Sequence, residues 1–260
     1  MRDCPHEELA QALGPLNDLY RLPDSVFNDD NIHAVLTGFD MLMLRATYAP
    51  ELRNGIGRVQ AAGMIGPLLA RLDPRGERGG QGNFPDTSRD CITAMETALT
   101  NGSSPGARRQ SIDRTVRIAQ QFGWGGPREG FSYYALGRLQ VGYDSTAAFS
   151  RADAIYSASP LMKIHSAHIA VQNAAFTLSA GDAMSTITLA DKAIPVAARH
   201  QNAALMATLM MFKAEALDMQ GDSVAAEAVR VDSLGWARYG FGSDANVRDR
   251  LAEISGLRPY

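Results

Sequence analysis

The stretch AEALDMQGDSVAA, residues 214–226, carries the pattern that predicts the fold. Helix-forming residues lead to Gly221, Asp222 follows at once, and a second alanine-rich run begins. A glycine at the end of a helix can take the left-handed conformation, and an aspartate after it can accept from the free N–H groups that start the next helix. The stretch therefore predicts two helices joined by a two-residue turn.

This joint recurs along the chain. The turn glycines lie 40, 39 and 40 residues apart: Gly102, Gly142, Gly181 and Gly221. Alanines stand at matched places around them: Ala135, Ala174 and Ala214 before the turns, and Ala107, Ala147 and Ala226 after them. Small residues at matched places let paired helices cross closely, and one pair cannot bury both its faces alone. The spacing predicts an all-α fold, a solenoid of stacked antiparallel helix pairs.

The chain resembles the tetratricopeptide (TPR) repeat superfamily over roughly residues 88–240. The best match is Ala214, Leu217, Gly221 and Ala226. The period here is 39–40 residues rather than the family's 34, and Arg151, Ala190 or Arg230 replaces the usual aromatic residue of the second helix. The resemblance implies a right-handed solenoid; a generic HEAT-like helical array is the alternative.

The domain organisation follows from this pattern. We expect an N-terminal helical cap or degenerate repeat (1–72), a flexible glycine-rich loop (73–84), TPR-like repeats (85–242) and a C-terminal capping helix (243–260). Within these parts, hydrophobic periodicity and turn residues predict helices near 30–48, 51–72 (interrupted by glycines), 87–101, 105–122, 128–141, 145–158, 160–180, 183–198, 201–220, 223–238 and 245–255.

Composition excludes several classes of protein. The chain has 25 basic and 28 acidic residues, spread evenly, so no basic face indicates nucleic-acid binding. No apolar run is long enough to span a bilayer, so we expect no membrane insertion. We expect a cytoplasmic protein; a periplasmic or secreted one is the alternative if a signal peptide has been removed.

The sequence offers few candidates for metal binding or catalysis. Cys4 and Cys91 are either two free thiols or one disulfide in an oxidising compartment. His165 and His168 share a helix face, but a metal site needs a third ligand, so we interpret them as groove or surface residues and expect no metal. No nucleophile motif or paired acid–base motif is present, so we expect a protein that is not an enzyme and takes no cofactor.

Two surfaces are candidates for binding a protein or peptide. If the resemblance holds, the first helix of each pair lines a concave face: Ser132, Leu136, His168, Val171, Gln172, Ala175, Met211 and Glu215. Trp124 and Tyr133, in the aromatic segment 122–134, either anchor a partner or fold back between repeats. The methionine-rich segment 205–212 is either an adaptable groove or a helix buried on both sides.

These patterns lead to three functional hypotheses. The first is a scaffold without enzymatic activity that binds a protein or peptide through the concave face. The second is a ligand-sensing regulatory domain acting through a partner. The third is an enzyme with its site between the segment 1–72 and the first repeat.

Overall fold

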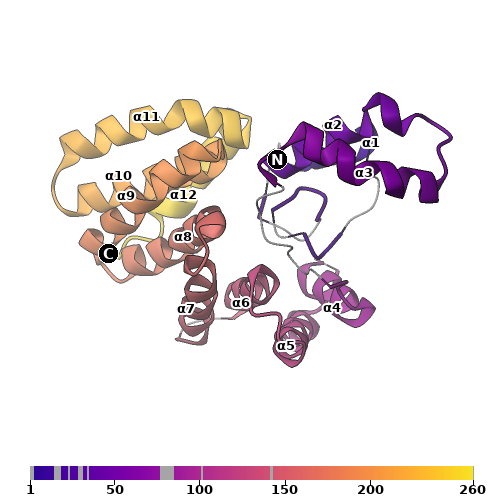
Figure 1. Cartoon of the computed structure of the whole chain (residues 1–260). Coiled ribbons are helices and arrows are strands. Elements are labelled where there is room, and N and C mark those ends of the chain that lie inside the picture. Colours follow the sequence, from indigo (N-terminus) through magenta and orange to yellow (C-terminus); the bar gives the residue numbers. More distant parts are fainter. Residues whose placement is uncertain are drawn as a thin grey trace. The chain divides into compact units, whose positions relative to one another are not determined.

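The computed structural model of the protein describes residues 3–14, 19–22, 24–28, 32–33, 35–76, 85–100, 102–140 and 143–259. Throughout these residues the regular structure is helical and no strand occurs, which confirms the all-α prediction. The chain divides into two compact units, Asp3–Ser88 and Arg89–Tyr260 (Figure 1). Most of the predicted glycine-rich loop, residues 77–84, lies outside the described residues.

The described residues of the first unit form three α-helices and a short 3-10 helix: α1 (Asp3–Leu13), α2 (Gly38–Thr47), η1 (Pro50–Leu52) and α3 (Arg58–Leu72). The helix predicted from residue 30 begins only at Gly38, because Thr37 caps it there in a capping box with Asp40. The predicted 51–72 helix is interrupted, as its glycines indicate, between η1 and α3.

A single buried carboxylate organises this unit. Asp40 is fully buried and accepts hydrogen bonds from Ser25 Oγ at 2.6 Å, Val26 N at 3.1 Å and Thr37 N at 2.7 Å. These bonds fix an irregular segment against α2, and Val26 and Phe27 then pack in a small apolar core with Ala10 of α1. Polar contacts therefore carry much of the order in this unit.

The second unit contains nine described α-helices in sequence. They are α4 (Arg89–Leu99), α5 (Pro105–Gln121), α6 (Pro127–Leu139), α7 (Tyr143–Ser157), α8 (Lys163–Ser179), α9 (Ala183–Arg199), α10 (Ala203–Met219), α11 (Ser223–Phe241) and α12 (Asp244–Ser255), with the short η3 (Pro160–Met162) before α8. Each helix packs against the next, and α8 also packs against α10. This arrangement agrees with the predicted succession of helix pairs.

The joints from α8 to α11 share one geometry. Gly181, Gln201 and Gly221 all take positive φ angles, of 80°, 54° and 82°. The N–H of the residue that follows each donates to a carbonyl five residues back, at 2.9–3.1 Å. These are the hydrogen bonds of the Schellman motif, which satisfies the last carbonyls of a helix.

The residue after each turn caps the next helix. Asp182, Asn202 and Asp222 each accept from the backbone N–H three residues on, at 3.0–3.1 Å. The predicted joints at Gly181 and Gly221 are thus confirmed, and an unpredicted equivalent stands midway at Gln201. Gly102 has no positive φ, and Gly142 lies outside the described residues.

Small residues let these helices cross closely. A Cβ added to Gly240 of α11 would lie 2.5 Å from the backbone N of Ala204 in α10, and one added to Gly137 of α6 would lie 2.7 Å from the Phe149 ring of α7. Helices α8 to α12 share one apolar core.

No described helix of the chain is both long and apolar enough to cross a membrane.

Candidate functional site

The face predicted to be concave is largely buried. Met211 is 1 % exposed, and Ser132, Val171 and Glu215 are buried as well. The remaining predicted residues are half-buried: Leu136, His168, Gln172 and Ala175. Four of the eight predicted residues are thus inaccessible, and the role of the other four in binding stays a prediction.

The C-terminal part of the chain explains part of this burial. Helix α12 packs against α10 and α11, and its Val247 and Ile254 join the core that contains Val171 and Met211. Part of the face on α10 is thus covered from within the unit. The methionine-rich segment 205–212 is largely buried, including Leu209, Met211 and Phe212. This agrees with its interpretation as a buried helix and not as an adaptable groove.

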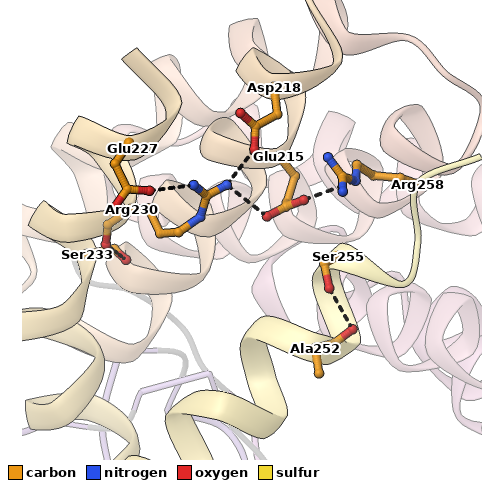
Figure 2. A network of polar contacts seen from close by, with 8 residues as sticks. All are labelled: Glu215, Asp218, Glu227, Arg230, Ser233, Ala252, Ser255 and Arg258. Atoms are coloured by element: carbon orange, nitrogen blue, oxygen red, sulfur yellow. Dashed lines mark hydrogen bonds and ion pairs between the residues drawn. The ribbon is translucent and has the colours of Figure 1, made fainter. Parts of the chain in front are cut away.

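A network of charged side chains ties the end of the chain to α10 and α11 (Figure 2). Arg230 of α11 contacts Asp218 at 2.6 Å, Glu227 at 2.9 Å and Glu215 at 3.3 Å. The other Glu215 oxygen lies 3.1 Å from Nε of Arg258, which follows α12. Glu215 is therefore a buried carboxylate held between two guanidinium groups.

The chemistry of this network is structural. The hydrogen bond to Asp218 is the largest cause that raises the pKa of Arg230 above its usual range, so this side chain stays charged at any physiological pH. The network joins three carboxylates to two arginines, and every one of these side chains has a partner of opposite charge. It has no reactive group beyond these ion pairs, and it fixes the C-terminal tail to the helices beneath.

A second polar cluster is more accessible. We define the aromatic–arginine surface by five residues of α6, α7 and the α5–α6 turn: Phe122, Trp124, Arg128, Tyr133 and Arg151. The rings of Phe122 and Trp124 stack at 6.1 Å with an interplanar angle of 22°. The Arg128 guanidinium lies 4.0 Å from the centroid of the Trp124 ring, within the range of a cation–π contact. Phe122 is 61 % exposed.

The turn that presents Trp124 is built by its glycines. Gly123 and Gly125 have φ angles of 59° and 56°, in the left-handed region that suits glycine. The N–H of Gly125 donates to Glu129 Oε2 at 3.1 Å. Glu129 is a buried side chain, so this bond pins the turn to the start of α6. The tryptophan therefore sits on a defined turn.

Tyr133 occupies the neighbouring part of the surface. Its hydroxyl accepts from Gln120 Nε2 at 2.6 Å, which joins α6 to α5. The Arg151 guanidinium of α7 lies 5.8 Å from the Tyr133 ring and 3.5 Å from Glu129. Trp124 and Tyr133 are both half-buried. The two residues that the sequence singled out thus belong to one connected cluster.

The sequence reasoning missed three members of this surface. Phe122 and Arg128 lie in the same aromatic segment, 122–134, as Trp124. Their positions on either side of three glycines were the sequence pattern that could have indicated them. Arg151 stands where the TPR family has an aromatic residue, a departure that marked the position without revealing its contact. Two guanidinium groups beside one buried carboxylate give this surface an excess of positive charge. The surface also carries three aromatic rings, those of Phe122, Trp124 and Tyr133.

The histidines and cysteines occupy other places. His165 is buried, and its ring lies 4.8 Å from that of Tyr156, whose hydroxyl pKa is raised well above its usual value by burial. In the described parts of the chain, no three His, Cys, Asp or Glu side chains come close enough to hold a metal ion. Cys91 is a buried thiol of α4, and the side chain of Cys4 lies outside the described residues, so the disulfide stays a prediction.

Comparisons with known proteins concern the first unit. Residues 1–66, about a quarter of the chain, match the model of a family described as "Protein of unknown function (DUF2927)". Neither the curated proteins nor the solved structures gave a match. The family match ends within α3 and includes no residue of the aromatic–arginine surface.

Proposed function

We propose that the protein is a helical-repeat scaffold without enzymatic activity that binds another protein or peptide through the aromatic–arginine surface. The observation that carries the proposal is the presentation of Trp124. Its ring stacks on the exposed Phe122 and lies 4.0 Å from the Arg128 guanidinium, on a turn held by Glu129. Tryptophan, tyrosine and arginine are the side chains that most often anchor protein interfaces.

We further propose that residues 85–242 form a right-handed, TPR-like stack. The recurrence of one joint at Gly181, Gln201 and Gly221 supports it, as does the contact of α8 with α10 across the intervening helix. In such a stack the first helix of each pair touches the first helix of the next pair. The aromatic–arginine surface then lies at a joint between helix pairs, since it spans the α5–α6 turn and reaches α7.

The charges of this surface favour a particular kind of segment. Arg128 and Arg151 bring two positive charges to it, whereas Glu129, which pairs with Arg151, is buried. A ligand with an acidic side chain can pair with the guanidinium groups, and an aromatic, proline or aliphatic side chain beside it can cover the Trp124 and Phe122 rings. We therefore propose that the partner is a short segment that combines acidic and apolar residues.

The test uses the two tryptophans of the chain. Peptides are selected by display on the wild-type protein, on Trp124→Ala and on the control Trp236→Ala, which removes an exposed tryptophan of α11. Binding of the selected peptides is then titrated in a Trp236→Phe variant, in which Trp124 is the only fluorescent tryptophan. Truncation of an anchoring tryptophan costs about 2 kcal/mol or more, so we expect at least about a 30-fold loss of affinity in Trp124→Ala.

The outcomes of this test separate clearly. Acidic–apolar peptides that bind the wild type and Trp236→Ala, perturb the Trp124 fluorescence and fail on Trp124→Ala support the proposal. Equal binding to Trp124→Ala overturns the assignment of the surface. Selection of no peptide by the wild type counts against a peptide-binding scaffold.

A further inference from the structure

Helix α11 has apolar residues on two opposite faces. One face, made of Ala226, Ser233, Ala237 and Gly240, is buried. The opposite face carries Val224, Ala228, Val231, Gly235 and Tyr239, all exposed, with Val224 at 85 % and Val231 at 58 %. At 100° per residue these five positions lie within one stripe along the helix. We call this set the α11 stripe; α11 forms the upper edge of its unit in Figure 1.

The exposed face of α9, the equivalent helix one repeat earlier, has a different composition. Forty residues earlier, the equivalent positions of α9 are Met184, Thr188, Asp191, Pro195 and Arg199. These residues are exposed too, and three of the five are polar or charged. A solvent-facing helix normally has such a mixed face, whereas a helix that is apolar on both sides is normally covered on both. The α11 stripe is therefore more apolar than the equivalent face of α9.

Two charges along one edge of the stripe have a self-complementary arrangement, and the opposite edge carries the exposed Asp232. Glu227 and Arg238 flank the same edge of the stripe, 11 residues apart and with opposite sign. Both are well exposed, with side-chain exposures of 64 % and 59 %, and each also pairs within its own chain, Glu227 with Arg230 and Arg238 with Asp244. If a second α11 runs antiparallel across the stripe, a two-fold axis between residues 232 and 233 brings each Glu227 opposite the other Arg238. The midpoint of the stripe, between Val231 and Asp232, lies within one residue of that axis.

We propose that the α11 stripe binds the α11 stripe of a second copy of this chain, antiparallel and related by a two-fold axis. The contact is isologous, because the same patch serves both partners. Ala228 and Gly235 near the centre let the helices approach closely, and Val224 of one copy lies toward the Tyr239 end of the other. The proposal is independent of the peptide-binding function, which uses α5, α6 and α7.

One helix from each side makes a small interface. Specific interfaces below about 1,200 Å² are weak. We therefore expect a dissociation constant on the order of 10–100 µM, and an association that depends on concentration.

The first experiment measures the mass of the whole protein by sedimentation from about 1 to about 500 µM. We expect the wild type to move from the mass of one chain toward that of two. A Val224→Asp/Val231→Asp variant should remain monomeric throughout, with at least a 30-fold weaker association. The matched control is Met184→Asp, which places a charge on an exposed apolar residue at the equivalent position of α9; it should associate as the wild type does. Helical circular dichroism checks that all variants are folded.

A charge exchange tests the orientation. Arg238→Glu alone should weaken association, because the introduced carboxylate then faces Glu227 of the other copy, and Glu227→Arg/Arg238→Glu should restore it. A wild type that is monomeric at every concentration overturns the proposal, as does a dimer that survives Val224→Asp/Val231→Asp. A dimer lost in that variant but not restored by the exchange overturns the antiparallel arrangement.

Discussion

The two units of the molecule keep their helices together in different ways. In the unit Arg89–Tyr260, one backbone joint recurs at Gly181, Gln201 and Gly221, each with the same hydrogen bonds. In the unit Asp3–Ser88, the corresponding task falls to the buried carboxylate of Asp40, which holds an irregular segment to α2. The first solution is distributed over many short-range bonds, whereas in the second one buried carboxylate accepts several hydrogen bonds beside two small apolar clusters.

This difference predicts how each unit responds to damage. A repeated local motif adds nearest-neighbour contributions, so the loss of one joint weakens a stack without abolishing it. A buried acceptor with several donors is less tolerant, because its removal leaves those donors buried without a partner.

The largest effect is expected from Asp40→Ala. The substitution removes the acceptor of Ser25 Oγ, Val26 N and Thr37 N and the capping box of α2. Hydrogen bonds to a charged group contribute about 1.5–3 kcal/mol each, so we expect a loss of at least about 3 kcal/mol for this unit. Hydrogen–deuterium exchange should show rapid exchange throughout α1 and α2, while α8 to α11 stay protected.

The control for this prediction is Asp86→Ala in the same unit. Asp86 pairs with Arg21, but its side chain is 85 % exposed, and such surface pairs contribute little. We expect unchanged exchange in this variant. Protection of α2 that persists in Asp40→Ala would contradict the central role of the carboxylate, and a parallel loss of protection in α8 to α11 would contradict the contrast between the units.

Substitutions at the joints should change the free energy of unfolding by an intermediate amount, with opposite signs at Gly221 and Gln201. Gly221→Ala places a Cβ at a φ of 82°, where no other atom lies within 4 Å, so any cost comes from the backbone alone. A non-glycine residue in the left-handed region costs about 1 kcal/mol, and we expect that loss in chemical denaturation. Gln201→Gly removes the same strain from the α9–α10 joint and should stabilise by about 0.5–1 kcal/mol.

These two variants are mutual controls, since they make opposite changes at equivalent joints. The combined variant Gln201→Gly/Gly221→Ala should have close to wild-type stability, because distant sites add. If both single variants destabilise, then Gln201 contributes contacts that outweigh its backbone strain, and the joints are equivalent in geometry only.

The sequence predicted the regular parts of the molecule better than the irregular ones. The glycine spacing located the joints at Gly181 and Gly221 because backbone chemistry limits which residues fit there. It predicted a break between the helices 183–198 and 201–220 but not the left-handed conformation of Gln201, where the remaining signal was the capping residue Asn202. It also missed Asp40, although Thr37 and Asp40 have the spacing of a capping box.

The site was harder to predict than the fold. Trp124 and Tyr133 could be named from the sequence, because aromatic residues beside glycines are conspicuous. The contact of Arg151 with both Tyr133 and Glu129 depends on how α6 crosses α7, which no local pattern encodes. Glu215 pairs with Arg258 of the C-terminal tail, which is 43 residues further along the sequence. Long-range contacts of this kind are where the inference from the repeat pattern failed.

The smallest expected effect concerns the charge at one joint. Hydrogen bonds from Ser185, through its side chain first and then its backbone N–H, lower the pKa of Asp182 from its usual 3.8. A lowered pKa in the folded state stabilises the protein at pH values above 3.8, and this contribution is lost as the pH falls through the folded-state pKa.

Asp182→Asn keeps a capping oxygen but removes the charge at the start of α9. We therefore expect its Tm to lie about 1 °C below that of the wild type at pH 7, and the difference to shrink as the pH falls below 3.8 through the folded-state pKa of Asp182. Asp232→Asn, which removes an exposed charge in the middle of α11 without altering a cap, is the control. A difference in Tm that stays constant from pH 7 to pH 3 would show that the charge of Asp182 does not cause it, whereas equal Tm values at pH 7 would show that aspartate and asparagine are interchangeable at this joint.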